Sequence, residues 1–202
     1  TSKFLQERDD MKKISLTLSF LFLLVGLFGC QQNTSEKVAI APSNTESVET
    51  KVEVTEGDFI YRLVTEKAEY AENEPIKIYA ELEYIGSKEE IEIGHGGSPF
   101  HFPMLETTRN YEIMYRMEQP YLSTKLMKGE PLRQEYKGSG GFGSQDKKDY
   151  IEFMKRIMNQ EFPKGNYVVN GFAEFDVIDR ETKQKKKYNI KSQVEFMVNN
   201  SN

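Results

Sequence analysis

The chain has 202 residues, of which 38% are hydrophobic and 12% aromatic, with one cysteine and a formal net charge of −5. This length allows one domain of ordinary size, whose core needs neither a metal nor a disulfide. The single cysteine excludes an intramolecular disulfide. The acidic charge, without a basic stripe interleaved with aromatics, argues against nucleic acid as a partner.

Residues 1–29 carry the pattern of an export signal. Met11-Lys12-Lys13 is a short basic stretch, and residues 14–28 form an apolar run broken only by Ser, Thr and Gly. As a helix this run is about 22 Å long, shorter than a hydrocarbon core of about 30 Å, so a signal segment fits better than a spanning helix. We therefore predict a signal peptide, preceded by an upstream extension at residues 1–10.

The apolar run ends in Leu27-Phe28-Gly29-Cys30, which resembles the lipobox of bacterial lipoproteins. The resemblance implies cleavage before Cys30, a diacylglycerol thioether on its sulfur and acylation of the new N-terminus. Two or three acyl chains anchor a protein stably, because each buried CH₂ contributes about 0.8 kcal/mol. We expect Cys30 to hold the chain on the outer face of the cell membrane. An uncleaved N-terminal anchor with an incidental cysteine is the alternative.

Residues 30–57 are predicted to form a lipidated, disordered tether. Residues 31–55 are rich in Gln, Asn, Thr, Ser and Glu and contain no aromatic residue, so they bury too little apolar surface to fold. We expect the folded domain to begin near Asp58 and to occupy residues 58–202.

From Asp58 onward, apolar and polar residues alternate with the period of half-buried antiparallel strands, most clearly at residues 76–84. Other strands are predicted at 59–64, 90–93, 100–104, 111–117 and 132–137. The last two, 167–178 and 188–198, should pair and face each other's apolar rows: Val169, Ala173, Phe175 and Val177 against Ile190, Val194, Phe196 and Val198. Short strands punctuated by turns predict a mostly β, antiparallel β-sandwich.

One amphipathic helix is predicted after Asp149, because apolar residues recur there at helical spacing: Tyr150, Ile151, Met154, Ile157 and Met158. Glu152 follows Asp149 by three residues, as in a capping box, and is placed to pair with Arg156 one turn later. Pro163 ends the helix and leads into the next strand.

Three segments carry a family resemblance: Glu69-Tyr70 with Glu74-Pro75-Ile76, Ile93-Gly94-His95-Gly96-Gly97-Ser98-Pro99-Phe100, and Phe162-Pro163 with Gly165 and Tyr167. They resemble the immunoglobulin-like domain of the intracellular proteinase inhibitor family of bacilli, and more closely uncharacterised lipoproteins of such bacteria, over residues 58–104 and 162–198. The resemblance implies an immunoglobulin-like β-sandwich, into which the predicted short helix is inserted. The chain departs from the family in being exported and in an insertion at residues 105–161, so inhibition does not carry over by residue.

The two histidines, His95 and His101, flank a Gly-Gly-Ser-Pro-Phe turn and suggest a metal site. Such a site needs three or four ligands, and the nearby carboxylates are Glu106 and those at 89, 90 and 92. The alternative is a structural turn in which His95 bonds the backbone. A nucleophile made of Ser98 and a histidine lacks an orienting acid.

Two loops have weaker signals. Residues 138–143 match GxGxxG, but a dinucleotide site needs these glycines to join a strand directly to a helix, and here the predicted helix starts too late. A flexible loop is the better interpretation. The basic residues of 183–187 lie at a predicted hairpin tip and suit either an anionic surface or a solvated turn.

The insertion concentrates aromatic and methionine side chains: Tyr111, Met114, Tyr115, Met117, Tyr121, Leu122 and Met127. Such side chains suit partner binding, although most of them pack in cores. The candidate binding surface is Tyr115, Tyr121 and Phe142 with His95 and His101.

The leading hypothesis is a membrane-anchored, extracytoplasmic lipoprotein that serves as a non-catalytic binding module for a protein or cell-wall component, without a cofactor. The alternatives are an exported proteinase inhibitor and a metal-binding protein that uses His95 and His101.

Overall fold

The computed structural model describes residues 48–116, 120–178 and 184–200. The predicted signal peptide, Cys30, most of the predicted tether, Met117 and residues 179–183 of the last hairpin lie outside these ranges. The described residues belong to one compact unit, Thr45–Asn202. Within them, no helix has the length and hydropathy that crossing a membrane requires.

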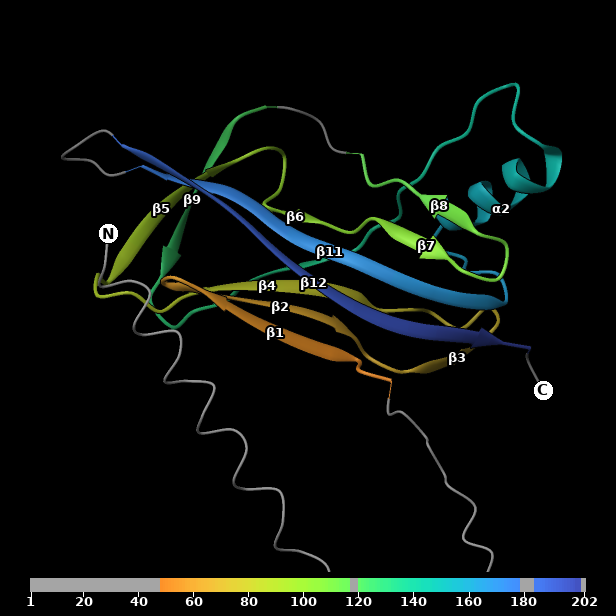
Figure 1. Ribbon diagram of the computed structural model, residues 1–202, viewed down its shortest axis with the longest axis horizontal. Coiled ribbons are helices and arrows are strands. Elements are labelled where there is room, and N and C mark those ends of the chain that lie inside the picture. Colours follow the sequence, from red (N-terminus) through yellow and green to blue (C-terminus); the bar gives the residue numbers. More distant parts are fainter. Residues whose placement is uncertain (1–47, 117–119, 179–183, 201–202) are drawn as a thin grey trace, which may run out of the picture. The chain divides into compact units, whose positions relative to one another are not determined.

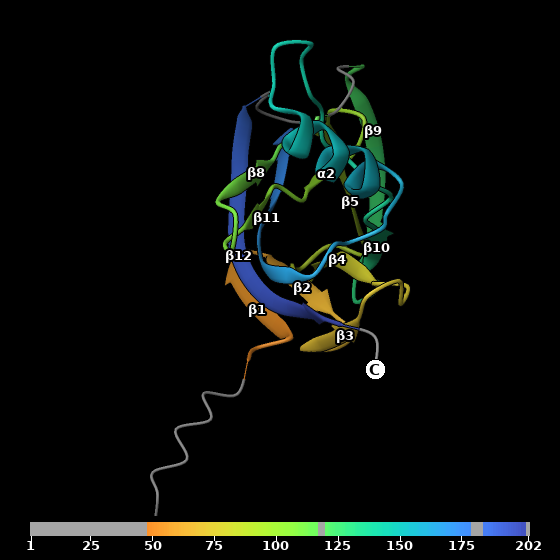
Figure 2. The same cartoon turned by 90° about the vertical axis from the view of Figure 1, so that its right-hand side faces the viewer.

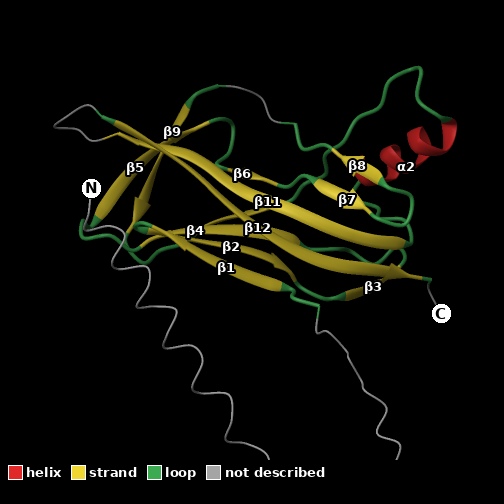
Figure 3. Ribbon diagram, in the orientation of Figure 1, coloured by secondary structure: helices red, strands yellow, loops and turns green. Residues whose placement is uncertain are grey.

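Two sheets pack against each other (Figures 1 and 3). The first sheet has the order β1-β2-β4-β10, with β1 Lys51–Glu56, β2 Phe59–Thr65, β4 Ile78–Tyr84 and β10 Leu132–Glu135. The second has the order β3-β12-β11-β5-β9, with β3 Glu69–Ala71, β12 Lys185–Asn199, β11 Gly165–Ile178, β5 Glu90–His95 and β9 Leu122–Met127. The short strands β6 Phe100–His101 and β7 Met104–Glu106 also pair with β11, and β8 Tyr111–Ile113 pairs with β7.

All these pairings are antiparallel except that of β3 with β12, which is parallel. The predicted mostly β, antiparallel sandwich with one short helix is confirmed. Its immunoglobulin-like character stays a prediction.

The hairpin of β11 and β12 consists of the two longest strands of the second sheet and lies near its centre. Its register places Val169 opposite Val194 and Ala173 opposite Ile190. The predicted inward rows are buried, apart from Val177, which is only partly buried near the end of β11. The long alternation of apolar and polar residues thus fixed both the pairing and the buried face of this hairpin.

Aromatic clusters mark the two ends of the core. At one end, the ring of Phe59 lies 4.8 Å from Phe175 and 4.9 Å from Tyr188, measured between centroids. At the other end, Phe196 stacks on Tyr167 at 5.0 Å and meets Tyr70 edge-on at 5.7 Å. These buried rings carry much of the apolar area that holds the sheets together.

The folded domain begins earlier than predicted. Strand β1, Lys51–Glu56, pairs with β2 through six residue pairs, with Val54 opposite Tyr61. Val52 and Val54 pack partly buried against the core. The tether assignment of residues 51–57 is therefore wrong. Two alternating valines suffice for an edge strand here, because the backbone N–H and C=O groups of β2 are available to pair with it.

Other strand boundaries also differ from the prediction. Residues 100–104 divide into β6 and β7, with Pro103, which has no backbone N–H to donate, between them. The predicted strand at 111–117 is reduced to β8, Tyr111–Ile113, among its described residues. Strands β3 and β9 were not predicted from the sequence, because β3 is short and β9 is mostly exposed.

The one helix among the described residues, α2, spans Lys148–Met158 and lies beside β8 in both views (Figures 1 and 2). It buries Phe153, Met154 and Ile157, whereas Met158 of the predicted face is exposed. The predicted capping box is absent, since the N-cap is Lys147 without a side-chain bond.

Two side chains of α2 have partners other than those predicted. The carboxylate of Asp149 instead accepts a hydrogen bond from the Tyr111 hydroxyl at 3.1 Å. Arg156 pairs with Glu72 at 3.0 Å and not with Glu152. Arg156 also lies 3.8 Å from Glu161, just after the helix. Tyr111 and Glu72 come from distant parts of the chain, which ties the helix to the sandwich.

Candidate functional site

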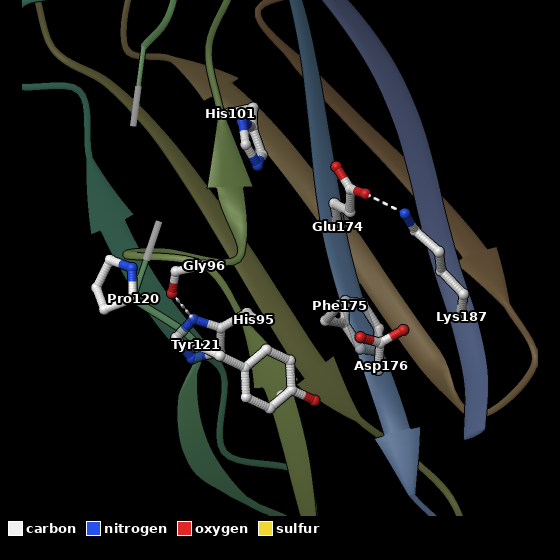
Figure 4. Close-up of a pocket in the computed structure, with 10 residues that line it drawn as sticks. His95, Gly96, His101, Pro120, Tyr121, Glu174, Phe175, Asp176 and Lys187 are labelled. Carbon is white, nitrogen blue, oxygen red and sulfur yellow. Dashed lines mark hydrogen bonds and ion pairs between the residues drawn. The ribbon is translucent and has the colours of Figure 1, made fainter. Parts of the chain in front are cut away.

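A pocket of about 260 Å³ opens on the second sheet (Figure 4). Strands β5, β6, β11 and β12 and the segment before β9 contribute its walls: Gly94, His95, Gly96, His101, Pro120, Tyr121, Glu174, Phe175, Asp176 and Lys187. Glu174 and Asp176 alternate along β11 with the buried Ala173 and Phe175. Their side chains therefore lie on the outer face of the sheet, away from the core.

Gly94 makes room for the pocket. It lies opposite Asp176 of β11 and Ser123 of β9, in the middle of the sheet. A Cβ atom at this position would lie 1.8 Å from the hydroxyl oxygen of Tyr121. Only glycine therefore lets the Tyr121 ring lie across β5, which explains a glycine inside a strand.

Tyr121 is the main exposed aromatic side chain of the pocket. It is 58% exposed, while the end of its ring rests on Gly94. The ammonium of Lys185 lies 5.1 Å from the ring centroid. Gly94 and Lys185 thus contact the ring, and the rest of its apolar surface is exposed to solvent beside polar groups.

The two carboxylates of the pocket are both paired with lysines of β12. Lys185 Nζ lies 2.6 Å from Asp176, and Lys187 Nζ lies 2.5 Å from Glu174. Hydrogen bonding to Asp176 raises the pKa of Lys185, and hydrogen bonding to Glu174 raises that of Lys187. Each lysine thus keeps its positive charge beside a carboxylate, and the two ion pairs balance each other's charges.

His95 is a structural residue of the pocket wall. Its Nδ1 lies 2.7 Å from the Gly96 carbonyl oxygen and its Nε2 lies 2.8 Å from Thr124 Oγ1. Because a carbonyl oxygen only accepts, Nδ1 donates to Gly96, and Nε2 bonds the Thr124 hydroxyl. Both nitrogens are thus engaged, as the structural alternative for this turn expects.

His101 has a different environment. Its ring stacks on Phe172 at 4.4 Å between centroids and meets Tyr115 edge-on at 6.0 Å. Burial lowers the pKa of His101, while the nearby Glu174 acts in the opposite direction. The imidazole is therefore neutral at pH 7, with one nitrogen as a donor and one as an acceptor.

The geometry gives the metal hypothesis no third ligand. Within the described ranges, no three side chains of His, Cys, Asp or Glu converge as a metal site. Glu106 is buried on β7 and accepts hydrogen bonds from the backbone N–H groups of Thr108 and Arg109. Ser98 donates to Gln134 at 2.6 Å and accepts from the backbone N–H of Phe100 at 2.9 Å.

The aromatic residues predicted as binding anchors lie in three different places. Tyr121 lies in the pocket. Tyr115 is half-buried and packs edge-on against Phe102 at 5.5 Å, so it is not a free anchor. Phe142 is 42% exposed beside α2, with the Lys155 ammonium 5.8 Å from its ring centroid.

The glycine loop does not form a nucleotide cradle. Gly138 and Gly140 adopt positive φ angles of 83° and 139°, and the helix begins only at Lys148. A Cβ at Gly138 would lie 2.6 Å from the carbonyl oxygen of Met158, so the loop packs against the end of α2 instead of preceding its start. This geometry lacks the strand-to-helix junction that binds phosphate.

Sequence patterns missed Glu174 and Asp176 as pocket residues, and they placed Lys187 at a hairpin tip, whereas it lies within β12. These residues look like the ordinary polar positions of two alternating strands, and only the register across β12, β11 and β5 brings them beside Tyr121. The one usable signal is Gly94, since a glycine within a strand often marks the close approach of another group.

No family model, curated protein or solved structure matches this chain. The resemblance to the proteinase inhibitor family and to bacterial lipoproteins therefore stays a prediction.

Proposed function

We propose that this chain is a membrane-anchored extracytoplasmic lipoprotein whose β-sandwich serves as a non-catalytic binding module. It binds a cell-wall component or a protein through the pocket around Tyr121. The observation that carries the proposal is a largely exposed aromatic ring beside convergent polar groups, which is the usual composition of a recognition site.

The position of the pocket suits an anchored binder. Contacts trace the point where the chain joins the domain, Thr50, to one end of β11. The carbonyl of Thr50 accepts from the backbone N–H of Thr65, and the hydroxyl of Thr65 bonds that of Tyr70. Tyr70 pairs with Val198, which lies opposite Gly165 at the start of β11.

Asp176 lies near the other end of β11, about 35 Å farther along the strand. The start of β1 and all of β3 accordingly lie toward the end of the domain away from β5 and β9, whereas β1 itself runs back toward them (Figure 1). An anchor through Cys30 therefore leaves the pocket at the end of the domain that is remote from the attachment point.

The proposal is tested by capture from cell-envelope fractions with the full chain immobilised on beads. Tyr121→Ala should lower capture by about tenfold, as for a central aromatic anchor. Its melting temperature should be unchanged, because the ring is mostly outside the core. Phe142→Ala is the matched control, an exposed aromatic outside the pocket, and should capture like the wild type. Equal capture by the wild type and Tyr121→Ala contradicts the proposal.

A further inference from the structure

The balanced charges of the pocket restrict the chemistry of its ligand. Glu174 and Asp176 are each paired with a lysine of β12, so a cationic ligand competes with two ammonium groups already in place. An anionic ligand competes with the two carboxylates in the same way. A neutral ligand with several hydroxyl groups avoids both conflicts, since each hydroxyl donates to a carboxylate or accepts from an ammonium without breaking a pair.

The aromatic surface adds a second requirement. The exposed ring of Tyr121 offers a flat apolar area beside these charged groups. A suitable ligand therefore has an apolar face and a polar rim. A pyranose ring has this form, because its axial C–H bonds make one face apolar and its hydroxyls project around the edge.

The size of the pocket points to one ring. Its volume of about 260 Å³ lies just below the range of about 300–1,000 Å³ that accommodates drug-sized molecules. The side chains of Glu174, His101 and Tyr121 surround this space in Figure 4. A single sugar ring fits these dimensions better than an extended peptide.

We propose that the pocket binds one neutral pyranose ring, with Tyr121 against its apolar face and Glu174, Asp176 and Lys187 bonded to its hydroxyls. The inference rests on the proposed function, which it makes specific by naming the ligand. The neutral imidazole of His101 supplies one further donor or acceptor at the opposite side of the pocket.

Saturation-transfer difference NMR on the full chain in detergent tests this inference. The probes are methyl glucoside and methyl N-acetylglucosaminide as neutral rings, with glucosamine as the cationic and glucuronate as the anionic counterpart. We expect transfer to the ring C–H protons of the neutral probes, with affinities at least about tenfold above those of the charged probes. Tyr121→Ala should abolish the transfer, and Phe142→Ala should retain it.

Two sources of such a ring, a wall glycan and a free sugar, are separated by co-sedimentation with purified cell-wall glycan. Co-sedimentation that methyl N-acetylglucosaminide competes away supports a wall glycan. Transfer to the soluble glycosides without co-sedimentation supports a free sugar.

The inference is overturned by any of three results. These are the absence of transfer to every neutral probe, transfer that persists in Tyr121→Ala, and preference for a charged probe. If the neutral probes fail while capture from the envelope still depends on Tyr121, the sugar inference fails and the proposed function stands. If capture fails as well, both are wrong.

Discussion

Glu106 shows how a buried charge is accommodated in this sandwich. Its carboxylate accepts hydrogen bonds from Thr108 N at 2.9 Å and Arg109 N at 2.8 Å, and the Arg109 guanidinium lies 3.2 Å away. A Cβ at Gly165 would lie 2.3 Å from Glu106 Oε1, so glycine is required opposite the carboxylate. Burial alone raises the pKa of Glu106, but these hydrogen bonds lower it below its usual value.

The lowered pKa predicts a pH-dependent contribution of Glu106 to stability. Because the folded-state pKa is below the unfolded value of about 4.3, the stabilisation is present above that value and is lost as the pH falls through the folded-state pKa. Glu106→Gln should lower the free energy of unfolding by about 1.5–3 kcal/mol at pH 7 and by less at pH 3. Urea unfolding at both pH values measures this. Glu112→Gln, at an exposed carboxylate, is the control, and the same pH dependence in both variants would contradict the assignment.

Gly94 offers a second test at the residue scale. Gly94→Ala places a methyl group where the Tyr121 hydroxyl lies, so the ring must leave its position. We expect capture by this variant to fall about as far as in Tyr121→Ala, while the melting temperature changes by only a few degrees, since alanine is compatible with a strand. Capture assays and thermal unfolding on the same samples decide this. Full capture by Gly94→Ala would show that the Tyr121 position is not needed.

At the scale of elements, the predictable parts are those whose signal is long and local. The hairpin of β11 and β12 follows from a long alternation, and α2 from its apolar face. Strands β1, β3 and β9 escaped prediction because they are short or exposed, and their pairing depends on a partner distant in the sequence. Tyr121, His95 and His101 were candidates from the sequence, but their meeting with Gly94 and Asp176 in one pocket was not predictable, because it depends on the sheet register.

Strand β1 gives the test at this scale. Deleting residues 31–47 from the full chain removes none of the described strands, whereas deleting 31–57 removes β1 as well. The longer deletion should lower the free energy of unfolding by about 2 kcal/mol, because two half-buried valines lose their contacts. This corresponds to a fall in melting temperature of roughly 4–8 °C. Circular dichroism melts compare the two. Equal melting temperatures would mean that β1 adds nothing to the fold.

At the scale of the whole molecule, the expected attachment point and the proposed binding pocket are separated along the chain. Cys30 precedes the domain, β1 begins at Lys51, and the pocket lies toward the far end of β11. The expected attachment is predicted from the sequence alone, whereas the pocket forms only where the sheet register brings its residues together. We therefore expect a mutation in one of them to leave the function of the other measurable.

The expected attachment leads to the prediction for Cys30→Ala. The basic stretch, the apolar run and the terminal cysteine together predict acylation of this residue, and two or three acyl chains are needed for stable anchoring. The wild-type protein should enter the detergent phase on phase partitioning and incorporate labelled palmitate in cells. Cys30→Ala should abolish the labelling and move the protein to the aqueous phase or leave an unprocessed precursor, whereas Gln31→Ala should behave like the wild type. Purified Cys30→Ala should still capture its ligand through Tyr121, because the pocket contains no part of the anchor. Labelling or partitioning that survives Cys30→Ala would rule out the lipid anchor and leave the binding function to be judged by Tyr121 alone.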